Sequence, residues 1–228
     1  MDVQEQKRQA AERAVEYIES GMVVGLGHGS TAIFAVQRLA TLIKDGILRD
    51  IVAIPCSKAV EQEARHLEIP LTTFATHPHI DITIDGADEV DSNLNLIKGG
   101  GGALLREKIV AQASQREIIV VDEGKLSSAL GTRFDVPVEV VSFGWQSQTR
   151  FLEDLGAVWR LRLDNTEQPL VTDQGNFILD CQFGPIDDPI QLGQALDSRA
   201  VIVEHGLFLG LATEVIVGAA DGLRYMRR

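Results

Sequence analysis

Hydrophobic residues in the first part of the chain recur with the period of an α-helix. Ala10, Ala14 and Ile18 fall on one stripe, and this spacing predicts a helix over residues 4–20. A glycine then interrupts the pattern, and the apolar run MVVGL at 22–26 predicts a short buried strand. A helix followed by a buried strand is a typical start of a layered α/β structure.

Short apolar runs continue to alternate with amphipathic segments up to about residue 130. The predicted elements are a helix over 30–46, a strand over 51–55, a helix over 57–67, strands over 71–74 and 80–84, a helix over 103–114 and a strand over 118–122. Ser57 precedes its helix at a position typical of an N-cap. Strands that alternate with helices in this way predict a mostly parallel sheet flanked by helices, a Rossmann-like main domain.

The pattern changes at about Arg133. The elements predicted beyond it are a strand over 136–141, a helix over 145–155, strands over 157–163, 170–172 and 176–180, a helix over 189–196 and a strand over 200–204. This β-α-β-β-α-β order resembles a ferredoxin-like α+β unit. Residues 206–222 return to apolar strand pairs that can rejoin the first sheet. We therefore expect an α/β protein with a catalytic α/β domain (1–130 plus 206–228) and a smaller inserted ferredoxin-like domain (131–205).

Composition and charge exclude several classes of function. The 228 residues are 45% hydrophobic and carry a formal net charge of −12, which argues against disorder and against a nucleic-acid partner. Cys56 and Cys181 lie far apart and outside any C-x-x-C motif, so neither a disulfide nor a zinc site is expected. The polar N-terminal segment and the absence of an apolar run of ~20 residues predict a cytoplasmic protein without a membrane partner.

The first cluster of candidate chemistry is Gly25-Leu26-Gly27-His28-Gly29-Ser30-Thr31, between a predicted strand and a predicted helix. Backbone N–H groups at a helix N-terminus favour an anion, and Ser30 and Thr31 add hydroxyl donors. A dinucleotide fingerprint fails because it needs glycine where Ser30 stands, and no Gly-Lys-Ser/Thr follows for a P-loop. The sequence therefore predicts a phosphate contact here, the alternative being a tight turn that merely needs glycine.

The second cluster, Asp85-Gly86-Ala87-Asp88-Glu89, follows the predicted strand 80–84. Ligands of open α/β sheets usually bind at the carboxyl ends of strands, where carboxylates can bind sugar hydroxyls or exchange protons with them. A solvated turn with Asp88 as a local cap is the alternative. A calcium loop that starts at Asp85 fits less well, because its sixth position is Val90 and not the glycine that such loops need.

The third cluster is Lys98 with the four glycines Gly99–Gly102, followed by a helix that carries Glu107. Four glycines are entropically costly, and we expect their backbone N–H groups to face ligand oxygens beside the Lys98 charge. Glu107 could act as a general base if burial raises its pKa. The alternative is an ordinary exposed residue within an Arg-Glu-Lys helix face.

These motifs carry a family resemblance. IDGADEVDSNLNLIKGGGGALLREKI, together with VVGLGHGST, VVDEGKL and VTDQGNFILD, closely resembles the ribose-5-phosphate isomerase A family across nearly the whole chain. The resemblance implies an α/β main domain with a smaller α+β domain, a homodimer or homotetramer, and no metal or other cofactor. It also implies interconversion of ribose 5-phosphate and ribulose 5-phosphate through an enediolate, within the non-oxidative pentose phosphate pathway.

The resemblance also assigns roles to individual residues. Glu107 matches the family's proton acceptor, Asp85 and Asp88 match its acidic pair for the sugar hydroxyls, and Lys98 matches the lysine that stabilises the enediolate oxygen. The implied substrate-binding positions are His28, Gly29, Ser30, Thr31, Gly86, Ala87, Gly99, Gly100, Gly101 and Lys125.

Some positions depart from the family pattern. His28 stands where threonine is usual, Gly124 replaces a serine, Leu105 replaces a threonine or similar residue, and 56–61 lacks the usual serines and threonines. These changes predict an isomerase with altered affinity. The open alternatives are an isomerase of another aldose phosphate or a non-catalytic sugar-phosphate-binding relative. A coenzyme A transferase would need a covalent glutamyl nucleophile, and a dehydrogenase would bind nicotinamide.

Overall fold

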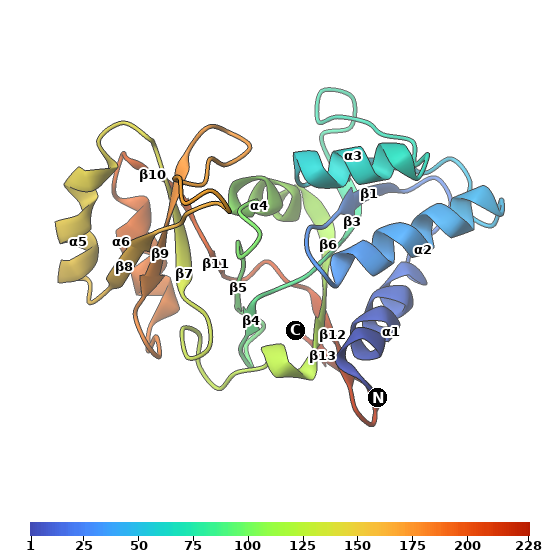
Figure 1. Ribbon diagram of the computed structural model, residues 1–228. Coiled ribbons are helices and arrows are strands. Elements are labelled where there is room, and N and C mark those ends of the chain that lie inside the picture. Colours follow the sequence, from blue (N-terminus) through green and yellow to red (C-terminus); the bar gives the residue numbers. More distant parts are fainter.

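The computed structural model describes all residues from Met1 to Arg228, and a six-stranded sheet forms its larger part (Figure 1). The strand order is β13-β12-β6-β3-β1-β2, and every neighbouring pair is parallel except the C-terminal hairpin β12–β13. The strands are β1 (Val23–Leu26), β2 (Val52–Pro55), β3 (Ile80–Asp85), β6 (Ser114–Asp122), β12 (Glu214–Ala219) and β13 (Gly222–Arg227). The prediction of a mostly parallel sheet that residues beyond 206 rejoin is confirmed.

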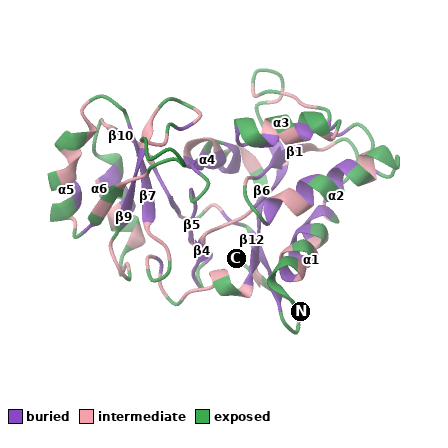
Figure 2. Ribbon diagram, viewed as in Figure 1, coloured by how far each residue is buried: buried purple, intermediate pink, exposed green.

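Helices cover both faces of this sheet. They are α1 (Val3–Val15), α2 (Ala32–Lys44), α3 (Lys58–His66) and α4 (Leu104–Gln112). One core joins α1, α2 and α3 to the sheet, and α4 packs on the opposite face. The parallel strands are mostly buried while the helices expose their outer sides (Figure 2), as expected for a parallel sheet enclosed on both faces. The antiparallel edge strand β13 is more exposed.

Side chains alternate along β3 and so divide its residues between these two faces. Ile82 and Ile84 enter the core beneath α1 and α2, whereas Thr83 bonds Ser114 at the other face. Asp85, two residues after Thr83, therefore points to the α4 side at the carboxyl end of the strand. The IDITID pattern thus places one buried carboxylate at the sheet edge where ligands usually bind.

The smaller α+β unit has an antiparallel sheet of order β10-β7-β9-β8. Its elements are β7 (Val136–Val140), η2 (Trp145–Gln148), α5 (Thr149–Asp154), β8 (Val158–Leu161), β9 (Phe177–Gln182), α6 (Pro189–Asp197) and β10 (Ile202–His205). A separate apolar core, which includes Val138, Leu152 and Leu196, joins its strands to α5 and α6. Element order and sheet order together are ferredoxin-like, so the predicted fold class is confirmed.

Three short strands link the two parts; two of them were not predicted, and the third lies within the apolar segment 206–222. They are β4 (Glu89–Val90), β5 (Leu96–Ile97) and β11 (Leu207–Phe208), in the order β11-β5-β4, and the short helix η1 (Glu123–Lys125) follows β6. β5 immediately precedes Lys98, and the Lys98 N–H donates to the Gly206 carbonyl at 2.9 Å. This short sheet therefore fixes the position of Lys98 and of the start of the glycine loop.

Two predicted strands and one helix end were wrong. Residues 71–74 form only an isolated bridge at Leu71, because a turn closes at Thr73, and residues 170–172 lead into a tight turn at Thr172. The first helix ends at Val15 rather than at residue 20, since the following N–H groups bond three residues back. None of the helices combines the length and the apolar character needed to cross a lipid bilayer.

Candidate active site

Asp85 is held by three donors at the end of β3. Its Oδ1 accepts from the His28 N–H at 2.9 Å and from the Gly86 N–H at 2.7 Å, and its Oδ2 lies 3.0 Å from Lys98 Nζ. A Cβ at Gly27 would lie 2.4 Å from Asp85. Gly27 therefore lets β1 pack against Asp85 rather than contacting a ligand, and Gly25 plays the same part beside Thr83.

Lys98 is a buried ammonium surrounded by oxygen atoms. Its side chain is 2% exposed, and Nζ lies 3.0 Å from Asp85 Oδ2, 3.2 Å from Glu107 Oε1 and 2.6 Å from the Gly86 carbonyl. Burial lowers the pKa of Lys98, but the carboxylates of Asp85 and then Glu107 outweigh it and raise the pKa above its usual value. Lys98 thus provides a fixed positive charge inside the protein.

Glu107 lies on α4 beside this charge and is buried, which rules out the exposed helix-face alternative. Burial raises its pKa to about 7, although the attraction of Lys98 opposes the shift. Its Oε1 bonds Lys98, whereas Oε2 is buried without a hydrogen-bond partner. A carboxylate with one free oxygen and a pKa close to neutrality is suited to accept a proton from a bound molecule.

Each of the four consecutive positions Gly99–Gly102 requires glycine, and the reasons differ between them. Gly99 and Gly102 adopt φ values of +103° and +80°, which favour glycine. A Cβ at Gly100 would lie 2.8 Å from Asp88, and one at Gly101 would lie 2.6 Å from the His28 ring. The Gly100 N–H donates to Asp88 Oδ2 at 2.7 Å. Two of these glycines therefore let the loop approach the side chains that line the site.

His28 is oriented by Ser57, the N-cap of α3. Ser57 Oγ accepts from the Val60 N–H at 3.1 Å and lies 2.9 Å from His28 Nδ1. Because Ser57 is buried, this contact holds the imidazole ring in one orientation. Sequence reasoning identified Ser57 as a cap, which is confirmed, but missed its contact with His28.

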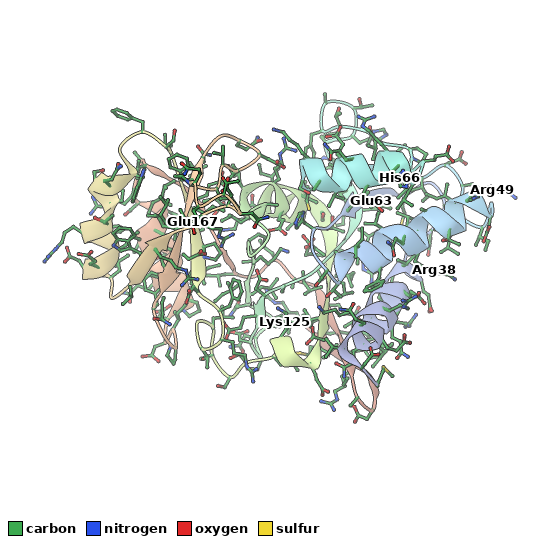
Figure 3. The ribbon with its side chains drawn as sticks, viewed as in Figure 1. Arg38, Arg49, Glu63, His66, Lys125 and Glu167 are labelled. Atoms are coloured by element: carbon green, nitrogen blue, oxygen red, sulfur yellow. The ribbon has the colours of Figure 1, made fainter.

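The opposite end of the site contains donors suited to an anion. Thr31 caps α2 without a side-chain cap bond, so the helix N-terminus stays open to a ligand. The Lys7 ammonium donates to Ser30 Oγ at 2.9 Å, and Lys125 approaches from η1 (Figure 3). Lys7 was missed, because nothing in an amphipathic helix 23 residues away indicates which loop it will meet.

A cavity of about 70 Å³ brings these groups together. All of its lining residues were predicted as site residues; they are His28, Gly29, Ser30, Thr31, Gly86, Ala87, Asp88, Lys98, Gly99, Gly100, Gly101, Glu107 and Lys125. Among the predicted residues, Asp85 alone lies behind the wall, where it contacts Lys98. Hollows of about 720 and 660 Å³ occur elsewhere, but neither contains the Lys98–Glu107 pair.

The site offers little to a metal ion. Cys56, Asp85 and Glu107 have ligand atoms within 4.8 Å of one another, yet the Lys98 ammonium bonds both carboxylates and takes the position between them. Burial raises the pKa of the Cys56 thiol well above its usual value, so it is a neutral thiol and a poor ligand. Both cysteines are free and buried.

Comparison with known proteins assigns the family. The family model described as ribose 5-phosphate isomerase A (phosphoriboisomerase A) matches residues 52–222. The chain belongs to the ribose 5-phosphate isomerase A family. The predictions of an enzyme, and of an isomerase in particular, are confirmed by this membership.

Similar proteins cover nearly the whole chain. The ribose-5-phosphate isomerase A of Desulfatibacillum aliphaticivorans is 60% identical over 97% of this chain and 96% of its own length, and that of Chloroflexus aurantiacus is 55% identical over 96% and 92%. The ribose 5-phosphate isomerase structure from Plasmodium falciparum superimposes with a TM-score of 0.95 at 39% identity over 99% of each chain. A D-ribose-5-phosphate isomerase in complex with phospho-erythronic acid gives 0.98 at 40% identity over 100% of each chain.

Proposed function

We propose that this protein interconverts D-ribose 5-phosphate and D-ribulose 5-phosphate through an enediolate, with Glu107 as the base. The observation that carries the proposal is the pair formed by Glu107 and Lys98, 3.2 Å apart and facing one cavity. An aldose–ketose shift needs a base near C1 and C2 and a positive charge for the developing oxyanion. The binding of a phosphorylated sugar acid by a related structure is in keeping with this substrate class.

In the proposed reaction, ionised Glu107 takes the proton from C2 of the open-chain aldose. The electron pair of the C–H bond forms the C1=C2 double bond, and the aldehyde oxygen becomes an oxyanion that Lys98 stabilises. Glu107 then returns the proton to C1, while the C2 hydroxyl proton moves to O1. We assign the transferred proton to Oε2 of Glu107, because this oxygen has no hydrogen-bond partner within the protein.

The two aspartates divide their work in this proposal. Asp88 lines the cavity and would handle the sugar hydroxyls, including opening of the furanose ring. Asp85 was predicted to share that task, but its three partners favour a role in holding Lys98 charged. His28, the Ser30–Thr31 segment and Lys125 would bind the substrate, with the phosphate at the N-terminus of α2.

Further parts of the proposal concern the whole molecule. We propose the domains 1–130 plus 206–228 and 131–205, because the two sheets have separate cores. We also propose a cytoplasmic homodimer or homotetramer that uses no metal and no nucleic-acid partner. The ammonium between the carboxylates of Asp85 and Glu107 supports metal independence. Analytical ultracentrifugation would measure the oligomeric state.

The decisive experiment follows ribulose 5-phosphate formation from ribose 5-phosphate, with and without EDTA, beside Glu107→Gln. We expect activity that resists EDTA and falls at least about 1,000-fold in the variant. Activity that is lost with EDTA would contradict metal independence. A fully active Glu107→Gln variant would contradict the assignment of Glu107 as the base. A folded wild-type protein without activity would favour the two alternatives, a binding protein or an isomerase of another aldose phosphate, which a panel of aldose phosphates would separate.

A further inference from the structure

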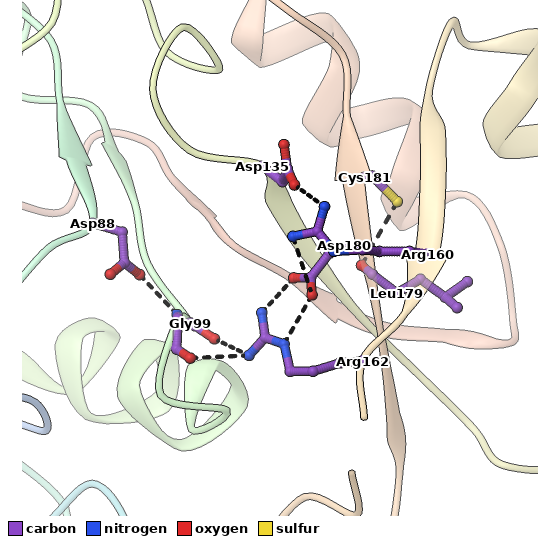
Figure 4. A network of polar contacts seen from close by, with 9 residues as sticks. Asp88, Gly99, Asp135, Arg160, Arg162, Leu179, Asp180 and Cys181 are labelled. Carbon is purple, nitrogen blue, oxygen red and sulfur yellow. Dashed lines mark hydrogen bonds and ion pairs between the residues drawn. The ribbon is translucent and has the colours of Figure 1, made fainter. Parts of the chain in front are cut away.

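The glycine loop depends on a side chain from the smaller α+β unit. Arg162, which follows β8, donates from Nη1 to the carbonyls of Gly99 and Gly100 at 2.7 and 3.2 Å (Figure 4). On the other side of the same peptide segment, the Gly100 N–H donates to Asp88 Oδ2 at 2.7 Å. The loop is therefore fastened between one arginine and one carboxylate of the site.

Arg162 is itself rigidly held. Its Nε donates to Asp180 Oδ2 at 3.1 Å, and its Nη2 pairs with Asp180 Oδ1. The Arg162 N–H also donates to the Ile178 carbonyl at 2.9 Å. The arginine and aspartate side chains are only 12% and 8% exposed, and a two-pronged arginine–carboxylate pair fixes the plane of the guanidinium.

Glycine residues make this support necessary. Gly99–Gly102 have no side chains of their own to anchor them, and consecutive glycines have many alternative conformations. A groove of about 380 Å³ borders the loop and is lined by both Gly100 and Arg162. On the side of the loop that faces this groove, the two hydrogen bonds from Arg162 hold the loop in place.

We propose that Arg162 is a positioning residue that holds Asp88 in its working orientation. It fixes the carbonyls of Gly99 and Gly100, and the N–H of Gly100 in turn bonds Asp88. Arg162 does not line the substrate cavity, so it acts through the loop and not by touching substrate. The inference rests on the proposed function, in which Asp88 handles the sugar hydroxyls. It makes the smaller unit a contributor to the reaction, since Arg162 and Asp180 both belong to it.

The test compares Arg162→Gln and Arg162→Lys with Arg160→Gln as the matched control. Arg160 pairs with Asp135 and lies 3.9 Å from Asp180, but it is 67% exposed and does not bond the loop. We expect Arg162→Gln to lower kcat on the order of 10- to 100-fold with a much smaller change in KM. Arg162→Lys should recover part of this loss, and Arg160→Gln should keep the wild-type kcat.

A double-mutant cycle with Asp88→Ala shows whether the effect passes through Asp88. If it does, Arg162→Gln has little further effect on kcat/KM once Asp88 is absent; full multiplication of the two losses would overturn the inference. Equal kcat for wild type and a folded Arg162→Gln would overturn it as well, and Arg162→Lys serves if the glutamine variant does not fold. An inactive wild type would instead refute the proposed function.

Discussion

The two ends of the active-site cavity hold their charges in different ways. At the reactive end, Lys98 and Glu107 are 2% and 5% exposed and bond one another. At the other end, called the phosphate end because we propose that Ser30, Thr31 and Lys125 bind the phosphate there, Ser30 is exposed and Lys125 is only half-buried. Buried charges need exact partners and resist substitution, whereas exposed charges are screened by water and contribute little to stability. The reactive end should therefore govern both folding and chemistry, and the phosphate end mainly affinity.

The largest effect is expected from Lys98→Met, which removes the central charge of the reactive end. The carboxylates of Asp85 and Glu107 would remain buried without their cation, which costs about 3–5 kcal/mol of unfolding free energy. Loss of the charge that faces the oxyanion should lower kcat about 100- to 1,000-fold. Urea unfolding and steady-state kinetics measure the two quantities, and an unchanged stability would contradict the comparison.

The pH dependence of activity sharpens the view of the reactive end. With a Glu107 pKa of about 7, kcat/KM should fall about tenfold for each pH unit below 7, because the protonated carboxyl cannot accept a proton. A profile that stays flat down to pH 5 would contradict this assignment. Because the phosphate of the substrate titrates in the same pH range, KM is measured at each pH to separate substrate binding from the titration of Glu107.

The same group should make stability depend on pH with the opposite sign. The folded pKa of Glu107, about 7, lies above its ordinary value of 4.5, so the folded state binds the proton more tightly. Its contribution to stability is full below pH 4.5 and is lost as the pH rises through 7. Urea unfolding of Glu107→Gln should show a smaller fall in stability over this range than the wild type does.

Lys125→Met is the matched substitution at the phosphate end. We expect KM for ribose 5-phosphate to rise about tenfold, because one charge-assisted contact to the phosphate is lost. The unfolding free energy should change by less than about 1 kcal/mol, since Lys125 is not buried. A stability loss as large as that of Lys98→Met would abolish the distinction between the two ends.

The smallest effect is expected at His28, which lines the cavity beside the glycine loop. His28→Thr removes an imidazole that lines the cavity and should change KM by about three- to tenfold, the value of one hydrogen bond. Ser57→Ala should have a similar but weaker effect, because the imidazole ring would lose the partner that orients it. Unchanged KM values would remove His28 from substrate binding.

The sequence determined the fold class, and together with the family resemblance it named all the residues that line the cavity. Alternating apolar segments specify which elements form, and the order Asp88, Lys98, Gly99–Gly102 and Glu107 brings the chemistry close together, since these residues lie within one short span of chain. Both the periodicity of apolar residues and the short distance along the chain between these groups can be read directly from the sequence.

Only the tertiary structure decided which charges are paired and which are free. Asp85 lies behind Lys98 because the alternation of β3 turns it toward α4, and Gly25 and Gly27 make room for β3. Lys7 reaches Ser30 from α1, and Arg162 reaches the glycine loop from 62 residues away. Such contacts depend on the order of strands and the docking of two sheets, which long-range packing sets and local sequence does not.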